Sequence, residues 1–273
     1  MGSVIDSDAL LRAAYYVTLG ACGCTLLLIL TIAWLRLSRQ LRLRRQAARA
    51  ADWEPLIALC ALEPPAAQPR VKRRHRGAFF ELWNHFYDLQ RGEGHNHLRQ
   101  LAGDPRLRAY VSHALRWGGL RSQIIAATTA GHLADPASMP ALKPLVHHDS
   151  PTLSLAAAKS LMEIDPAANL PWLFPLIAQR VDWPISSVAT TLRDLGVGVF
   201  APPLAQAVRD TAETPHESQQ LARLLRLTEI ARQTHIMPAI RALFERGDAL
   251  NAEVLAACLR LIVSPDDAHW ARR

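Results

Sequence analysis

The residues best suited to chemistry in this sequence are its eleven histidines. The closest groupings are His95-x-His97 and the pair His147-His148. A zinc site needs three or four converging ligands, held in place by further hydrogen bonds. No third or fourth ligand accompanies either pair. Residues 92–96 have the composition of a loop and His147-His148 falls at a turn between helices, so we expect solvated histidines and no bound metal.

Catalytic motifs are also missing from the sequence. It contains no GxSxG, HExxH, Walker A or GxGxxG pattern. Asp135 and Asp165 each precede a proline, a position where an aspartate caps a turn or the start of a helix. We therefore expect no catalytic residues and no cofactor, and a protein that is not an enzyme.

An aromatic cluster is formed by Trp83, Phe86 and Tyr87. Two interpretations are open: the rings line a binding groove, or they pack in a core, which large apolar side chains do more often. We count Trp83 and Tyr87 among the candidate partner-binding residues.

The elements that would position these residues are predicted to be helices. Half of the 273 residues are apolar, only 13 are glycine, and aromatic residues make up 6%. A composition dominated by Ala and Leu favours helix over strand. The four cysteines form no CxxC pair, which is typical of free thiols in a reducing compartment. The sequence predicts an all-α fold.

The excess positive charge lies in one short segment. Between residues 36 and 76, eleven Arg or Lys face three acidic residues, whereas residues 77–273 hold nineteen of each. A protein that binds nucleic acid spreads basic residues over the contact face of its folded domain. The neutral C-terminal part therefore predicts no nucleic-acid partner.

Residues 13–35 form a stretch of 23 residues without a formal charge. As an α-helix this stretch is about 35 Å long, enough to cross a bilayer core of about 30 Å. Tyr15, Tyr16 and Trp34 stand at its ends, where such rings favour the two membrane interfaces. A buried core helix is the alternative, but core helices seldom run this long without a charge. We predict a transmembrane helix.

Flanking charges decide between an anchor and a cleaved signal peptide, which has its basic residues before a shorter apolar run. Here Asp6 and Asp8 precede the run. The order predicts an uncleaved single-pass anchor in a bacterial inner membrane, with residues 1–12 outside and the bulk of the chain in the cytoplasm. The basic residues that follow the run are Arg36, Arg39, Arg42, Arg44, Arg45 and Arg49.

Residues 36–76 are predicted to be a basic juxtamembrane helix and a linker. We expect the helix to continue out of the bilayer, and residues 53–62 to form a short helix that lies on the membrane surface. Residues 63–69, EPPAAQP, have the composition of a linker. A second basic run contains Lys72, Arg73 and Arg74. Both basic runs are expected to lie against anionic lipid; a docking surface is the alternative.

A repeat begins near residue 120. Pro140, Pro171 and Pro202 are 31 residues apart, and Pro238 follows after 36. Apolar residues recur two, five and six residues after each proline, and seven and ten residues before it, with Thr228 the one exception. Self-similarity at this period predicts stacked helical units. Leu161 and Leu192, and Leu145 and Leu176, are expected to occupy equivalent core positions.

Each unit is predicted to be two helices. The proline is expected at or near the first turn of the first helix, where its missing N–H is tolerated. The second helix is rich in alanine, as in LSLAAAKSLMEI at 153–164. Neither helix buries its apolar face alone, so neighbouring units must stack.

Residues 134–164 and 165–195 resemble the short HEAT-like repeats of phycobilisome-lyase-related proteins. The resemblance covers about residues 120–246 and departs where the family often has an arginine, here Ser154 and Ser186. It implies an α-solenoid of HEAT-like helical hairpins over 120–273, preceded by an irregular helical cap at 77–119. No bilin-binding residue carries over.

The expected function is that of a membrane-anchored cytoplasmic scaffold whose repeat surface binds a protein partner, for example a membrane enzyme such as a polysaccharide synthase. The alternative is an enzyme of HEAT-like fold with lyase-type or base-excision activity. Exposed polar residues of the second helices complete the candidate partner surface: Ser154, Lys159 and Arg193.

Overall fold

The computed structural model describes residues 7–64, 69–90, 92–213, 218–231, 237–241 and 254. Within them the chain is almost entirely helical and contains no strand. Contacts divide the chain into two compact units, Met1–Leu56 and Ile57–Arg273. The helices are α1 (Ser7–Leu62), α2 (Arg76–Leu89), α3 (Glu93–Leu101), α4 (Pro105–Trp117), α5 (Leu120–His132), α6 (Met139–Leu145), α7 (Pro151–Ile164), α8 (Pro166–Gln179), α9 (Ile185–Leu195), α10 (Val197–Ala212) and α11 (Ser218–Thr228), with 3-10 turns η1 (Arg73–His75) and η2 (Pro136–Ser138).

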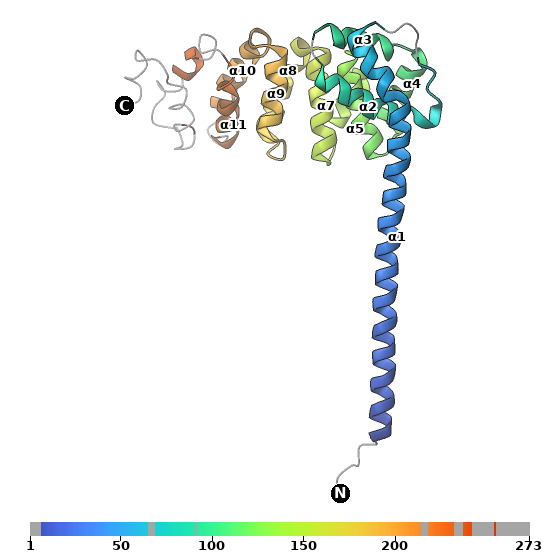
Figure 1. Ribbon diagram of the computed structural model, residues 1–273. Helices are drawn as coiled ribbons and strands as arrows, with labels where there is room; N and C mark the ends of the chain where they lie inside the picture. The colour runs from blue at the N-terminus through green and yellow to red at the C-terminus, as the bar shows by residue number, and fades with distance from the viewer. Residues whose placement is uncertain are drawn as a thin grey trace. The chain divides into compact units, whose positions relative to one another are not determined.

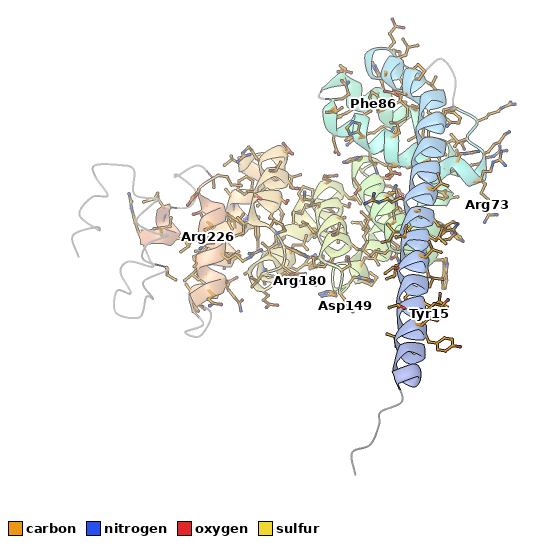
Figure 2. All side chains as sticks on the ribbon, turned by 60° about the horizontal axis from the view of Figure 1, so that its bottom comes forward. Tyr15, Arg73, Phe86, Asp149, Arg180 and Arg226 are labelled. Carbon is orange, nitrogen blue, oxygen red and sulfur yellow. The ribbon has the colours of Figure 1, made fainter. Side chains whose placement is uncertain are left out.

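The first unit consists of the N-terminal part of α1, which is one continuous helix of 56 residues (Figure 1). Its segment Tyr15–Leu37 is long and apolar enough to cross a membrane. The Leu26 to Leu30 side chains are about 60% or more exposed. Figure 2 shows Tyr15 extending away from the helix, as expected for a ring at an interface.

Residues 53–62 do not form the separate helix that we considered. They continue α1 without a break, and Pro55 lies inside it. Beyond the unit boundary, Ile57 and Cys60 are buried in the second unit, at 0% and 3% exposure. Burial of these apolar side chains explains why the end of α1 belongs to the second unit.

The second unit places alternate helices side by side. In one set, α5 packs against α7, α7 against α9, and α9 against α11 (Figure 1). In the other set, α4 packs against α6, and α8 against α10. The two sets are joined by contacts between α4 and α5, between α6 and α7, and between α10 and α11. Ahead of them, α2 packs against α5.

The recurring apolar positions fill the core of this unit. Two residues after each of the first three prolines, the leucine is fully buried, and six residues after it an aliphatic side chain is also fully buried. The position ten residues before the proline, which includes Leu161 and Leu192, is buried as well. These side chains are Leu142, Leu173 and Leu204; Val146, Ile177 and Val208; and Ala130, Leu161 and Leu192.

One expectation about the repeat is wrong in detail. Leu145 and Leu176 are only half-buried, because one residue later Val146 and Ile177 point into the core instead. The proline was expected at or near the first helical turn, and in α6 it lies within that turn, at Pro140. Pro171 and Pro202 lie inside α8 and α10, which begin five residues earlier.

The early start of α8 has a local cause. Asp165 caps the helix by accepting a hydrogen bond from the Ala168 amide at 3.0 Å, and Pro166 takes the first helical position. Asp135 caps η2 in the same way through the Ala137 amide at 3.3 Å. The predicted capping role of both aspartates is confirmed. Asp104, before Pro105 of α4, does the same.

Candidate functional site

A stack of three rings stands where α2, α3 and α5 meet. The Tyr87 ring lies between His95 and His132, with centroid distances of 4.2 and 4.3 Å and interplanar angles of 12° and 16°. His95 does not lie in a loop, as its sequence context had suggested, but in the first turn of α3. One of its ring nitrogens is 3.1 Å from the Tyr87 carbonyl oxygen. The stack holds the rings of Tyr87 and His132 in a fixed orientation relative to each other.

The register of α2 on α5 brings Asp88 to His132. Asn84 donates to the Ile125 carbonyl at 3.2 Å and accepts from the Thr129 hydroxyl at 3.1 Å. One turn further along both helices, Asp88 Oδ1 lies 3.2 Å from His132 Nε2. Neighbours one turn apart share a helix face, so the buried Asn84 sets this pair.

The backbone carbonyl of His132 is also held by a hydrogen bond. Arg99 donates from Nε to the His132 carbonyl at 2.7 Å, and its guanidinium lies 5.8 Å from the centroid of the Tyr87 ring. The His132 side chain is 8% exposed, and its buried Nδ1 has no hydrogen-bond partner in the part of the chain that the structure describes. An unpaired buried nitrogen is uncommon, because it loses its contact with water without replacement.

Glu163 extends the polar cluster onto α7. Burial raises the pKa of its carboxyl, Asp88 raises it further, and His132, Lys159 and Arg99 oppose the shift. Gly131 permits this close approach: a Cβ at that position would lie 2.6 Å from Glu163 Oε2 and 2.8 Å from Ser160 Cα. The absence of a side chain at Gly131 thus lets α5 and α7 pack tightly beside the carboxyl.

These residues line two adjoining hollows, of about 660 and 800 Å³. We call the two together the central groove. Its lining comes from α5, α7 and α9, with the end of α2 and, at one side, α3. Both hollows share the residues Asp88, His132, Glu163, Thr191 and Asp194.

The 31-residue repeat recurs in the lining of the central groove. His132, Glu163 and Asp194 are spaced by 31 residues, one place before the aliphatic that ends each second helix. Thr128, Lys159 and Thr190 have the same spacing and line the larger hollow. Equivalent positions of successive helices therefore lie along one face, and this spacing is the signal by which the sequence could have revealed the site.

The candidate partner-binding residues are only partly brought together. Trp83 is fully buried and donates its indole N–H to the Leu98 carbonyl at 2.9 Å, so it packs in the core. Tyr87 is 7% exposed but lines the smaller hollow. Lys159, half-buried, and Arg193, exposed, line the central groove.

Ser154 was expected to be exposed, and that expectation is wrong. Its side chain is fully buried and accepts hydrogen bonds from Arg180 Nη2 and Trp183 Nε1.

The remaining histidine pair, His147-His148, is exposed in the turn before α7, as expected. Among the described residues, no three His, Cys, Asp or Glu side chains are placed so that they could hold a metal ion. The absence of a bound metal stays a prediction from the sequence.

The basic residues of the second run lie on the surface. Lys72, Arg73 and Arg74 are exposed in and before η1, and Figure 2 shows Arg73 extending into solvent. In α1, Arg36 is exposed. The helix backbone continues through the other basic positions, whose side chains lie outside the described part: Arg39, Arg42, Arg44, Arg45 and Arg49.

In comparisons with known proteins, no protein family, no curated protein and no solved structure matches this chain.

Proposed function

We propose that this chain is a membrane-anchored scaffold that binds a protein partner in the central groove. The observation that carries the proposal is the spacing of His132, Glu163 and Asp194, which places one residue from each of three successive helices along the same groove. A stacked array of helical repeats generates extended binding surfaces of this kind.

The array is proposed to consist of HEAT-like helical hairpins forming an α-solenoid. Supporting this, the buried aliphatic positions recur with the period of the sequence, and the second helices pack in order. Helix α4 extends the array beyond the predicted start at residue 120. Its capping pair Asp104-Pro105 precedes Asp135-Pro136 by 31 residues, and α4 packs on α5 and α6.

The anchor is proposed to be Tyr15–Leu37, with the N-terminus outside and the folded unit in the cytoplasm. The basic residues that follow, and exposed Lys72, Arg73 and Arg74, would lie against anionic lipid. A reporter fused after Arg273 should behave as cytoplasmic, and one placed before Asp6 as external. The reverse pattern would contradict this orientation.

Tethering explains why a membrane-associated partner is the best fit. Confinement to one surface raises the effective concentration of any other protein held there. A membrane enzyme, such as a polysaccharide synthase, would gain most from such a scaffold. Recovery of the partner in mild detergent should be strong with the full chain, and weak for the same chain lacking residues 1–50.

Site-specific crosslinking tests the groove itself. A photoreactive residue at Thr152 or Thr190, both exposed in the lining of the larger hollow, should crosslink the partner in native membranes. The matched control is Gln206, which is exposed on α10 and not part of that lining. Equal crosslinking from Gln206 and from the two threonines would contradict docking in the groove.

An enzyme of HEAT-like fold, with lyase-type or base-excision activity, is the second candidate. The pair Asp88–His132 beside Glu163 favours it, because a carboxylate that orients a histidine is a common arrangement in acid–base catalysis. In the described part of the chain, no Ser, Thr or Cys side chain hydrogen-bonds to His132. Partner crosslinking that survives His132→Gln would favour the scaffold.

A further inference from the structure

The larger hollow of the central groove is lined by an excess of carboxylates. Asp88, Glu163, Asp182 and Asp194 contribute to it, and Lys159 is the only Lys or Arg among its described lining residues. Asp182 is neutralised by Arg180, at 2.7 Å. Three carboxylates therefore face one lysine, and the hollow is electronegative although the folded part of the chain is close to neutral.

Glu163 lacks a direct partner within this hollow. In the described part of the chain its carboxylate accepts no hydrogen bond and has no Lys, Arg or His nitrogen within 4.0 Å. Arg99, the nearest candidate on α3, is instead bound to the His132 carbonyl and lies against Tyr87. A largely buried carboxylate without a close donor is unfavourable, and a cation entering the hollow would relieve that cost.

His132 supplies an independent sign that the hollow is incomplete. Its side chain is more than nine-tenths buried and lines both hollows, while its Nδ1 has no partner among the described residues. Native proteins leave few buried polar atoms unpaired. Glu163 on α7 lines the same two hollows as His132 on α5, and a polar ligand there would pair with its carboxylate.

We propose that the partner enters the larger hollow of the central groove with a Lys- or Arg-rich segment, one basic side chain of which pairs with Glu163 and Asp194. This rests on the proposed function, because membrane proteins carry their excess of Lys and Arg in the cytoplasmic segments next to their spans. A scaffold tethered to the cytoplasmic face would meet such segments. Complementary charge selects them over neutral or acidic segments and raises the rate of association.

Binding of a synthetic peptide to the full-length protein in nonionic detergent tests this inference. The probe is a fluorescein-labelled peptide rich in Lys and Arg, and its control has Gln at each basic position; fluorescence anisotropy measures both dissociation constants. The basic peptide should bind saturably. The dissociation constant of the Gln peptide should be at least about tenfold higher. Non-specific electrostatics would not produce this preference, because a chain with a net charge of +7 repels a basic peptide on average.

Three variants locate the binding. Glu163→Gln and Asp194→Asn should each weaken binding of the basic peptide about tenfold. Glu213→Gln, at an exposed position of the α10 terminus outside the groove, should leave it unchanged. Asp194 is exposed, so its variant keeps the test valid even if Glu163→Gln perturbs the fold, which a thermal melt would report.

Equal binding of the two peptides, or equal binding by wild type and both groove variants, would overturn the inference. Its failure is distinguishable from failure of the scaffold proposal. If Thr152 and Thr190 crosslink a partner but the protein binds the basic and Gln peptides equally, only the inference is overturned. Peptide binding that depends on Glu163, with no crosslinked partner in native membranes, counts against the scaffold alone.

Discussion

The indole N–H of Trp183 donates to the hydroxyl of Ser154 at 2.9 Å, and both side chains are fully buried. Trp183 lies in the turn between α8 and α9, whereas Ser154 lies on α7. Arg180, whose guanidinium carbon is 5.4 Å from the centroid of the Trp183 ring, donates to the same hydroxyl. Arg223 of α11 caps the turn by donating to the carbonyls of Arg180 and Trp183. One serine thus joins α7 to the turn that leads into α9.

Replacing Ser154 with Ala should lower the free energy of unfolding by about 1–3 kcal/mol, because the buried Trp183 indole N–H loses its acceptor and half-buried Arg180 loses one of its acceptors. Chemical denaturation of the detergent-solubilised protein measures the change. The matched control is Ser186→Ala, at an exposed serine in the first turn of α9, with an expected change within about 0.5 kcal/mol. Equal effects at the two serines would mean that this hydrogen-bonded joint contributes nothing.

Truncating Leu161 or Leu192 to Ala should cost about 2–5 kcal/mol, since both are fully buried and a cavity remains. The same change at half-buried Leu145 or Leu176 should cost less than about 2 kcal/mol. Denaturant midpoints of the four variants decide the order. Comparable losses at all four leucines would contradict the assignment of Val146 and Ile177 to the core in their place.

Gly131→Ala should destabilise the second unit by about 1–3 kcal/mol through overpacking, because the new Cβ meets Ser160 Cα at 2.8 Å and α7 must shift. Gly198→Ala on α10 is the control. No atom lies within 4 Å of its Cβ position, and the helix should gain about 0.4–1 kcal/mol. Melting temperatures that move in the same direction for both variants would contradict tight packing of α5 on α7.

The raised pKa of Glu163 predicts a pH dependence of opposite sign to that of most carboxylates. The folded protein holds this proton above the ordinary value of 4.5, so the contribution of Glu163 to stability falls as the pH rises from there through the raised pKa. Wild type should therefore lose stability relative to Glu163→Gln as the pH increases from about 4.5. Melts of the two proteins across this range measure the difference, and other titrating groups cancel in it. A difference that is independent of pH would contradict a buried, unpaired carboxyl.

The local features of this chain follow from its sequence because short-range forces set them. The segment Tyr15–Leu37, whose only formally charged residue is Arg36, forms a helix that is long and apolar enough to span a membrane. Asp135 and Asp165 cap the elements that follow them because an aspartate side chain reaches the amide two or three residues on. The periodic leucines face inward because a helix places residues three and four apart on one side.

The candidate site, by contrast, is a product of tertiary contacts. Asp88 and His132 are 44 residues apart, and only the pairing of Asn84 with α5 brings them together. Ser154 has the appearance of a surface residue in the sequence, yet the Trp183 turn covers it. Periodicity specifies which face of a helix is apolar, but the identity of the segment that covers each residue depends on contacts between distant parts of the chain. For that reason the sequence determined the helices and their spacing, whereas the structure decided that His132, Glu163 and Asp194 share one groove.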